Sequence, residues 1–364
     1  MTKDAEPEKN DTDRPIRRLL TRVAIGALVL SLILAITGWA VFRFTNATDM
    51  LMRSTVKNLA LSQRHDLFTD GQIHVILLGT GSPQPGSERL PAANAVIAGD
   101  ELIIVDAGEG ASRTMSALRL PTQRISTVLL THLHSDHIGG LGQVLNESWN
   151  AGRPHEVTVY GPVGSQSIVD GLALQYQADI DYRSSGHVEK HDPTLALANA
   201  EELVVAPEDG LVRVFERNGV TVDVFHVDHG HVVPAFGYRI EYQGRSVVFS
   251  GDTAATPLMV DAAKNADVLI HEAMNMRMMR NAAQALGEID MPDVANQAAA
   301  IMGYHTDTLE LAKIASDANV SKLVLTHLIP APPNVIAARM FKSGMGQHYS
   351  GPIIVAEDRM MLSW

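Results

Sequence analysis

From residue 71 onward, short apolar runs alternate with longer stretches of helical spacing. Apolar runs bounded by Gly, Asp or His predict buried strands, and apolar positions three and four residues apart predict helices. The predicted strands cover residues 74–79, 95–98, 102–105, 127–130, 157–160, 203–205, 212–216, 220–226, 236–242, 246–250, 268–270, 323–325 and 353–356. The predicted helices cover residues 111–120, 141–145, 257–264, 291–302 and 308–318. This alternation predicts an α/β layered domain whose mixed sheets are flanked by helices.

The N-terminal region contains an uncharged stretch, residues 23–42, of about the length that a helix needs to cross a bilayer. The flanking arginines are Arg14, Arg17, Arg18 and Arg22 before the stretch and Arg43 after it. Their distribution favours a cytoplasmic N-terminus. A signal peptide would have a shorter apolar core and a small-x-small cleavage site, which Ala40-Val41-Phe42 does not match. We therefore expect an uncleaved single-pass membrane anchor with the catalytic part on the extracytoplasmic, periplasmic side.

The chain divides into four predicted parts. Residues 1–22 form a polar N-terminal tail, and residues 23–42 form the transmembrane anchor. Residues 43–70 form a tether with short helical character, and residues 71–364 form the catalytic domain. Within that domain, residues 164–202 lack strong periodicity, so we expect loops with one helix there.

Composition narrows the classes of partner and of metal ligand. The chain has 364 residues and a formal net charge of −12, with a sequence pI near 5.6. This balance is not typical of a surface that binds polyanions, because nucleic-acid-binding proteins usually carry a basic patch. Bound metal cations can supply positive charge locally, so a nucleic-acid substrate stays an alternative. The absence of cysteine excludes disulfides and thiolate ligands, so any metal is bound by nitrogen and oxygen atoms.

The strongest chemical motif lies at residues 131–140, Thr-His-Leu-His-Ser-Asp-His-Ile-Gly-Gly, directly after a predicted strand. His132 and His134 are two residues apart, so in extended geometry they lie on one side of the chain. Asp136 and His137 follow at the turn into the glycine pair. The motif offers two ligands to one metal ion and two to a second ion close by. Imidazoles and a carboxylate without thiolate suit zinc, with Mn²⁺ or Fe²⁺ as alternatives.

Three later strand ends each place polar groups after an apolar run, which is how α/β folds build a site. These groups are His226, His229 and His231 after the first run, Asp252 after the second and His327 after the third. The glycine before Asp252 allows close approach, so this carboxylate is the natural candidate to bridge two ions. Two further segments place His271 and Glu272 after a strand and His305 before a helix. His271 and Glu272 can orient metal ligands, and His305 can donate a proton to a leaving group.

Together these motifs resemble the metallo-β-lactamase superfamily, in its branch of tRNase Z and arylsulfatase-like hydrolases. The resemblance runs from about residue 73 to residue 330, most of the chain after the anchor. The matching motifs are Leu-Gly-Thr-Gly-Ser-Pro at 78–83, Val-Asp-Ala-Gly at 105–108, the motif at 131–140, Pro-Ala-Phe-Gly-Tyr at 234–238, Ser-Gly-Asp-Thr at 250–253, His-Glu-Ala at 271–273 and Leu-Thr-His at 325–327. The resemblance implies a four-layer αββα sandwich with a dinuclear site at the edge between the two sheets.

Position by position, the resemblance also implies the ligands of two zinc ions per chain. One ion would be bound by His132, His134 and a third histidine, and the other by Asp136, His137 and His327. Asp252 would bridge the ions, and Asp106 would brace a ligand. The third histidine is ambiguous: spacing of the tRNase Z type selects His231, and the arylsulfatase-like Asp-His-Gly context selects His229. We choose His229 because that context is complete.

The implied chemistry is the hydrolysis of an ester. Two zinc ions about 3.5–4 Å apart would supply a hydroxide nucleophile at neutral pH. Asp136 would accept the proton of the water, and His305, with Glu272 near it, would protonate the departing oxygen. The chain contains no cysteine, no GxSxG motif and no P-loop that would compete as the reactive group.

The sequence leaves three interpretations of the function. The first is a membrane-anchored dinuclear-zinc hydrolase of phosphodiester or sulfate esters of small molecules. The second is a tRNase Z-type nuclease that processes the 3′ ends of tRNA, but no long basic Gly/Pro-rich arm interrupts residues 161–202. The third is a non-catalytic metal-binding membrane protein. The resemblance also allows a homodimer.

Overall fold

The structure is a computed structural model that describes residues 13–44, 47–84, 86–186 and 191–364. Contacts divide the chain into two compact units, residues 1–63 and residues 64–364. The first unit contains helices α1 (Asp13–Phe44) and α2 (Ala47–Leu61). The predicted polar tail lies largely outside the described residues.

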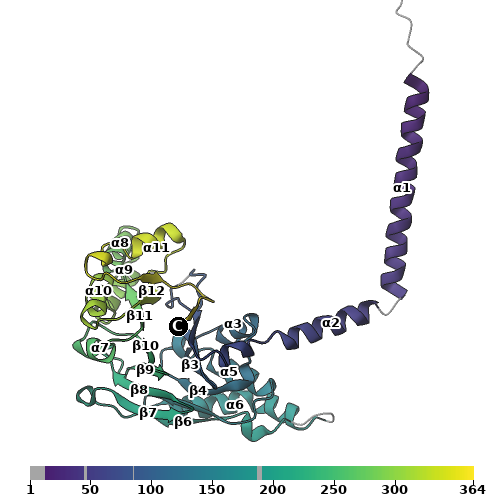
Figure 1. Ribbon diagram of the computed structural model, residues 1–364. Coiled ribbons are helices and arrows are strands. Elements are labelled where there is room, and N and C mark those ends of the chain that lie inside the picture. Colours follow the sequence, from purple (N-terminus) through teal and green to yellow (C-terminus); the bar gives the residue numbers. More distant parts are fainter. Residues whose placement is uncertain (1–12, 45–46, 85, 187–190) are drawn as a thin grey trace, which may run out of the picture. The chain divides into compact units, whose positions relative to one another are not determined.

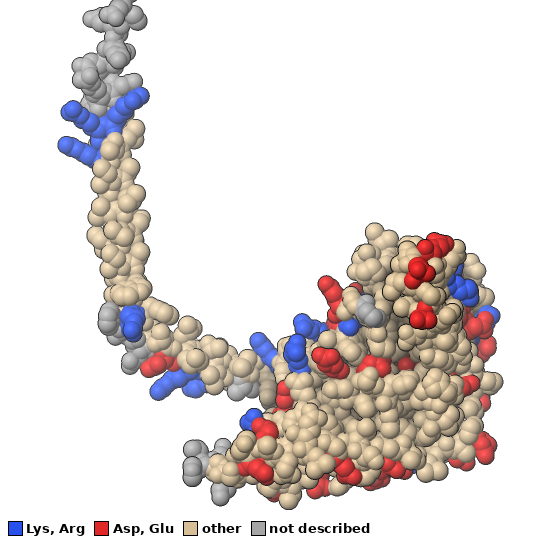
Figure 2. Space-filling view, turned by 180° about the vertical axis from the view of Figure 1, so that it is seen from behind, with Lys and Arg blue, Asp and Glu red and all other residues tan. Residues whose placement is uncertain are grey.

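Helix α1 is longer than the predicted anchor at residues 23–42. Its segment Ile16–Arg43 has a mean hydropathy of 2.4, and none of its most apolar window is buried. By length and composition it could cross a membrane. The helix extends past the apolar stretch at both ends because arginine is a good helix former. Figure 2 shows Lys and Arg side chains near both ends of this helix, with an uncharged stretch between them.

The second unit contains two mixed sheets, each of seven strands in the described part of the chain (Figure 1). The first sheet has the order β14-β1-β2-β3-β4-β5-β6. Its strands are β1 (Ile73–Gly79), β2 (Ala93–Ala98), β3 (Glu101–Ala107), β4 (Ile125–Leu129), β5 (Val157–Gly161), β6 (Ala198–Glu202) and β14 (Met361–Ser363). The second sheet has the order β13-β12-β11-β10-β9-β8-β7. Its strands are β7 (Val212–Arg217), β8 (Val220–His226), β9 (Phe236–Tyr242), β10 (Arg245–Phe249), β11 (Val268–Met274), β12 (Leu323–Ile329) and β13 (Ile353–Val355).

The two sheets pack face to face over a shared core. Along β1, Val75 and Leu77 point into this core, whereas Ile76 and Leu78 point to the opposite face. This alternation follows from the two-residue period of a strand. Both faces of the strand are buried, which explains why its residues 75–78 are continuously apolar rather than alternating.

Helices cover the outer face of each sheet and complete the four-layer αββα sandwich (Figure 1). The first sheet is covered by α3 (Ala111–Ala117), α5 (Leu141–Asn150) and α6 (Ser165–Ser184). The second sheet is covered by α7 (Pro257–Ala262), α10 (Thr308–Asp317) and α11 (Val335–Phe341). A helical pair, α8 (Met276–Glu288) and α9 (Pro292–Ala300), packs through Met279 and Ala298 against a small apolar cluster. The predicted fold class is confirmed.

Several element predictions were incomplete or wrong. The strand predicted at 203–205 lies instead at Ala198–Glu202, where β6 pairs in parallel with β5. Because β6 is an edge strand, backbone pairing places it there despite its polar sequence. Helices α8 and α11 and strand β14 were not predicted from the sequence.

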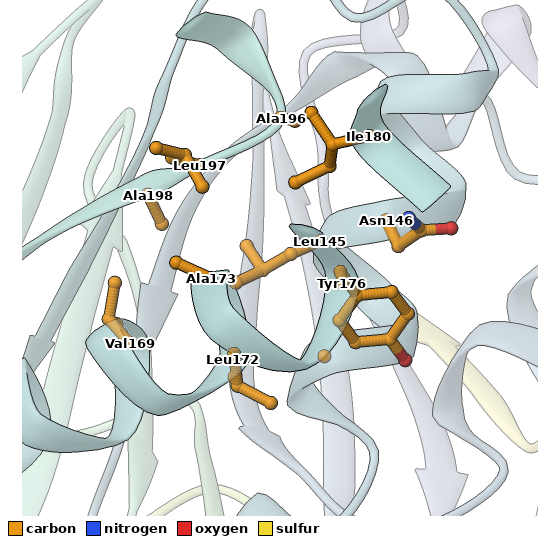
Figure 3. Close-up of a pocket in the computed structure, with 11 residues that line it drawn as sticks. Leu145, Asn146, Val169, Leu172, Ala173, Tyr176, Ile180, Ala196, Leu197 and Ala198 are labelled. Atoms are coloured by element: carbon orange, nitrogen blue, oxygen red, sulfur yellow. The ribbon is translucent and has the colours of Figure 1, made fainter. Parts of the chain in front are cut away.

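A crevice between α5, α6 and the start of β6 is lined mainly by aliphatic side chains (Figure 3). Leu145, Leu172 and Ile180 face it together with the Tyr176 ring. Its free volume of about 20 Å³ holds about one water molecule. We therefore assign it to the packing of α6 on the sheet rather than to a ligand site.

Candidate metal centre

The motif at residues 131–140 follows the end of β4 and includes the short helix α4 (Ser135–Ile138). His134 is the N-cap of α4, so His132 and His134 precede the helix in extended backbone. The glycines around this turn permit close backbone approach. A Cβ on Gly140 would lie 2.3 Å from the backbone oxygen of Gly108, and the Gly140 N–H donates to Ala107 at 2.7 Å. The glycine pair of the motif is therefore a packing requirement.

A first group of histidines comprises His132, His134 and His229, whose ligand atoms all lie within 4.8 Å of one another. His132 Nε2 is 2.9 Å from His134 Nδ1, and His229 Nε2 is 3.4 Å from the same atom. The rings of His132 and His134 meet nearly at right angles. Three imidazole nitrogens therefore converge on one point.

A second group comprises Asp136, His137 and His327, again with all ligand atoms within 4.8 Å. Asp136 Oδ2 lies 3.2 Å from His327 Nε2 and 3.5 Å from His137 Nε2. His327 reaches this position from a register shift between β11 and β12, with a left-handed φ of 42°. A bulge of this kind re-aims a side chain next to a site.

Asp252 lies between the two groups. Its Oδ2 is 3.4 Å from His137 Nε2 and 3.3 Å from His327 Nε2. The same oxygen is 3.9 Å from His132 Nε2 and 3.9 Å from His229 Nε2. One carboxylate oxygen thus contacts histidines of both groups.

Several buried polar atoms in this centre have no hydrogen-bond partner among the described residues. They are His137 Nε2, Asp252 Oδ1 and His327 Nδ1. A buried polar atom without a partner costs about 1–3 kcal/mol. A cation at this centre would provide a partner for His137 Nε2 and for the histidine nitrogens that face each other. Nitrogen and oxygen donors without sulfur fit a divalent metal, typically zinc. The residues present therefore fit a metal centre.

Electrostatics favour the metal-binding charge forms of the first histidine group and of Asp252. Burial holds the pKa of His132 well below its usual range, and it also lowers the pKa of His134 and of His229. Burial alone would raise the pKa of Asp252, but the nearby His327 and His137 hold it well below its usual range. Neutral imidazole and ionised carboxylate are the forms that coordinate a metal. For His137 the effect of burial is outweighed by Asp252 and Asp106, which hold its pKa well above its usual range.

Groups behind the centre orient its ligands. Asp106 Oδ2 lies 2.8 Å from His137 Nδ1, so the Nε2 atom of His137 faces the centre. Thr131 donates its N–H and its hydroxyl to the two oxygens of Asp106, both at 2.8 Å. His229 Nδ1 lies 3.2 Å from the backbone oxygen of Tyr304, which fixes the ring so that Nε2 points inward. Such partners fix the tautomer of a metal ligand.

His305 and Glu272 form a pair beside both groups. His305 Nδ1 lies 3.4 Å from Glu272 Oε1, which also accepts the Thr306 N–H at 2.7 Å. Burial lowers the pKa of His305, but the Glu272 carboxylate outweighs it, and the pKa is raised. The His305 ring stacks on His327 with 5.7 Å between ring centroids. His305 is thus a protonatable group at the edge of the centre.

Three predicted residues lie outside these groups. His226, the last residue of β8, is half-buried and is not part of any described group of converging donors. His231 is exposed and is not part of any described group of converging donors, so the loop brings His229 into the centre instead. His271 is buried, and its Nδ1 lies 2.6 Å from the backbone oxygen of Glu272. The supporting roles of Thr131, Tyr304 and Thr306 were not predicted from the sequence. A polar residue next to each predicted histidine was the only signal for them.

The model of the family described as "Metallo-beta-lactamase superfamily" matches residues 90–327 of this chain. Among curated relatives, "Ribonuclease Z" of Mycobacterium marinum is 35% identical over 262 residues, covering 71% of this chain and 87% of that protein. "Ribonuclease Z" of Mycobacterium bovis is 34% identical with the same coverage.

Solved structures share the fold. Human tRNase Z, short form, superposes with a TM-score of 0.56 at 23% identity, covering 79% of this chain and 98% of that one. The metallo-beta-lactamase fold protein YhfI from Bacillus subtilis gives a TM-score of 0.54 at 19% identity, covering 80% of this chain and 100% of that one. At these identities the superpositions establish the fold alone.

Proposed function

The chain belongs to the metallo-beta-lactamase superfamily and is a metal-dependent hydrolase acting on ester bonds, and from this we propose that it is a membrane-anchored dinuclear-zinc enzyme for phosphodiester or sulfate esters. The observation that carries the proposal is the position of Asp252, whose Oδ2 contacts histidines of both donor groups. A carboxylate shared in this way supports a pair of ions rather than a single one. Family membership leaves no ground for the non-catalytic alternative.

We assign the donors to two metal positions. His132, His134 and His229 would bind one ion, and Asp136, His137 and His327 would bind the other, with Asp252 between them. The ligand atoms of each group lie within 4.8 Å of one another, and those of His132, His137 and Asp252 do so as well, in keeping with a carboxylate between the two positions. Mn²⁺ or Fe²⁺ would fit the same donors.

The chemistry needs a nucleophilic water and an acid for the leaving group. Divalent ions bound here would make that water acidic and neutralise charge on the ester oxygens. Asp136 belongs to the second donor group, and its carboxylate would hold the proton that the water loses. His305 protonates the departing oxygen, and the Glu272 carboxylate keeps that imidazole protonated until transfer.

The substrate proposal is an ester of a small molecule. Helix α6 follows β5 where an extended RNA-gripping arm would begin. The acidic net charge of −12 also disfavours a polyanionic substrate. A sulfate ester and a phosphodiester present the same tetrahedral group of oxygens to the centre.

A second candidate is a nuclease that processes the 3′ ends of tRNA. The specific support is that relatives at 34–35% identity carry the name Ribonuclease Z. Such a function would require the catalytic unit to face the cytoplasm, where tRNA is found.

We further propose that residues 23–42 anchor the chain, with residues 71–364 as the catalytic domain on the extracytoplasmic side. The apolar segment Ile16–Arg43 and the arginines before it support this orientation. Alkaline phosphatase fused after Trp364 should be active, because that enzyme needs an oxidising compartment. An inactive phosphatase fusion together with a fluorescent cytoplasmic reporter fusion would contradict the orientation and revive the nuclease.

The function is tested with the zinc-loaded full chain in detergent. Turnover of bis(4-nitrophenyl) phosphate, 4-nitrophenyl sulfate and a 3′-extended tRNA is compared, with His134→Ala as the inactive variant. We expect turnover of at least one small ester that exceeds turnover of the tRNA. Cleavage of the tRNA alone would favour the second candidate, and activity that survives His134→Ala would overturn the assignment of the centre.

A further inference from the structure

A small cavity lies between the two sheets, next to the metal centre. It is lined by Val105 and Ile270, which belong to the core that the sheets share, and by Asp252 and His327 of the centre. Its free volume of about 20 Å³ holds about one water molecule and is too small for a substrate. Unlike the mainly aliphatic crevice beside α6, this cavity has many polar side chains in its lining.

Buried polar atoms without a hydrogen-bond partner gather around this cavity. Six of the residues that line it each have one such atom in the described part of the chain. His137 Nε2 is one of them and faces the metal position. The other five are Asn94 Oδ1, Asp252 Oδ1, Glu272 Oε2, Thr326 Oγ1 and His327 Nδ1. Buried polar atoms that no protein group reaches usually have a water as partner, whereas an apolar cavity of this size stays dry.

Three of these side chains already use their other polar atom in or beside the centre. Asp252 Oδ2 contacts histidines of both donor groups. Glu272 Oε1 accepts the Thr306 N–H at 2.7 Å, and His327 Nε2 lies 3.2 Å from Asp136 Oδ2. The atoms without a partner are therefore the ones left to face the cavity that these side chains line.

His327 is the proposed metal ligand that needs a partner on this side. A histidine that binds a metal through one ring nitrogen usually donates the N–H of the other to a carboxylate, a carbonyl or a water. For His137 Nδ1 this partner is Asp106, and for His229 Nδ1 it is the backbone oxygen of Tyr304. His327 Nδ1 is buried and has no such partner among the described residues.

The groups around the cavity match the two donor and two acceptor sites of one water. Asp252 Oδ1 and Glu272 Oε2 are carboxylate oxygens, which only accept hydrogen bonds when ionised. A metal on Nε2 leaves the proton of His327 on Nδ1, which then donates, and the Thr326 hydroxyl can donate as well. Glu272 and Thr326 are register partners on β11 and β12, so their side chains lie on the same face of the sheet. Asn94 Oδ1 is an alternative acceptor for one hydrogen of the water.

We propose that this cavity binds one ordered water that connects Glu272 to His327. The water accepts the N–H of His327 and donates to Glu272 Oε2 and Asp252 Oδ1. Glu272 is then a positioning residue for two groups, because its Oε1 atom holds His305 and its Oε2 atom fixes the His327 ring through the water. A cation is disfavoured here, since the N–H of His327 would face it. This inference rests on the proposed function, because it takes His327 as a metal ligand.

The first test is a crystal structure of the zinc-loaded full chain in detergent, at a resolution that shows internal waters. We expect one density peak in the cavity, about 2.7–3.2 Å from His327 Nδ1, Glu272 Oε2 and Asp252 Oδ1. Distances of about 2.3–2.6 Å to the carboxylates would identify a cation and overturn the water site. A cavity without a peak, or a direct hydrogen bond from Thr326 to Glu272 in its place, would also overturn it.

The second test removes one partner of the water and measures zinc binding. Thr326→Val replaces the hydroxyl by a methyl group, so the Kd of one of the two zinc ions should rise about tenfold while the other stays unchanged. Thr326→Ser should restore the affinity. Thr221→Val is the matched control, because the Thr221 hydroxyl is also buried without a partner among the described residues but lies on β8, outside this cavity. Zinc affinity equal to wild type in Thr326→Val would refute the positioning of His327 through the water.

Neither test depends on turnover, so the water site and the proposed function can fail separately. A water bound as proposed in a zinc-loaded protein that hydrolyses no ester would refute the proposed function and leave the water site standing. Ester hydrolysis by a protein without this water would refute the water site alone.

Discussion

At the scale of single residues, His137 shows how a ligand is aimed. The Asp106 carboxylate, 2.8 Å from His137 Nδ1, leaves His137 Nε2 facing the centre. Asp106 is itself held by two donors of Thr131, and its own φ of 57° places it in the left-handed region. A residue kept in that conformation by its surroundings is typical of a functional site.

Replacement of this carboxylate should weaken metal binding. Asp106→Asn keeps the size of the side chain but removes the charge that orients His137, so zinc affinity should fall about 10–100-fold. Competition with a chromogenic chelator measures this change. Asp100→Asn is the control, since Asp100 is an exposed carboxylate that pairs with Arg124. Equal zinc affinity in Asp106→Asn and wild type would show that Asp106 does not orient a ligand.

The glycine pair of the motif supports a prediction about stability. Gly140→Ala would place a methyl group 2.3 Å from the Gly108 backbone oxygen, and the backbone must move to accommodate it. We expect the free energy of unfolding in urea to fall by about 1–3 kcal/mol. Gly287→Ala, on the exposed side of α8, meets nothing within 4 Å and should be neutral or slightly stabilising. A Gly140→Ala protein as stable as Gly287→Ala would contradict the packing argument.

The identity of the proposed metal donors was easier to predict from the sequence than their arrangement in space. The four donors in the motif at 131–140 could be predicted because their spacing is fixed by the end of a strand. The choice between His229 and His231 depends on how their loop folds back. That loop is held by the Thr253 hydroxyl, which accepts the Asp228 N–H at 3.2 Å, and by the Asp228 carbonyl, which accepts from Ala254. Contacts between distant segments of this kind leave no local signal in the sequence.

At the scale of elements, the buried strands were predicted best. Strands such as β1 and β11 are buried along their whole length, so their apolar runs stand out. Helix α8 was missed because little of it is buried, and β14 because it is short and exposed. Edge strand β6 carries polar residues, so its position follows from pairing with β5 rather than from its own sequence.

An ion pair between the two sheets supports a prediction about pH. Glu101, at the start of β3, is only 3% exposed. Its carboxylate accepts hydrogen bonds from Arg217, at the end of β7, with 2.8 Å to Nε and 2.6 Å to Nη2. Burial raises the pKa of Glu101, but the hydrogen bonds from Arg217 and Ser126 outweigh it, and the pKa is lowered. The carboxylate therefore stabilises the fold above its unfolded pKa of about 4.3. This stabilisation is lost as the pH falls through the lower folded-state value.

Urea unfolding between pH 7 and pH 3 tests this link, with a chelator present so that metal loss does not contribute. Glu101→Gln should be less stable than wild type at pH 7, and its stability should change less as the pH falls below about 4.3. Glu216→Gln is the control, because the Glu216 carboxylate is 67% exposed. Parallel pH curves for Glu101→Gln and wild type would rule out a contribution from this pair.

At the scale of the whole molecule, the net charge and the two units of the chain support the proposed function as a membrane-anchored hydrolase of small esters. Asp and Glu are spread over the face of the catalytic unit seen in Figure 2, in keeping with the net charge of −12. The first unit contains the apolar segment Ile16–Arg43, which has the length of a membrane span. With the proposed anchor and a catalytic unit outside the cytoplasm, the enzyme would meet small esters rather than tRNA. The homodimer that the family resemblance allows stays a prediction.

The most direct measurement for the central claim is the number of zinc ions bound per chain. Mass spectrometry of metals on the zinc-saturated, desalted full chain should give two ions for wild type. Asp252→Asn should bind fewer, because the residue that contacts both donor groups loses its charge. Asp261→Asn, an exposed residue on α7, should keep both ions. One ion in wild type, or two ions in Asp252→Asn, would contradict a dinuclear centre bridged by Asp252.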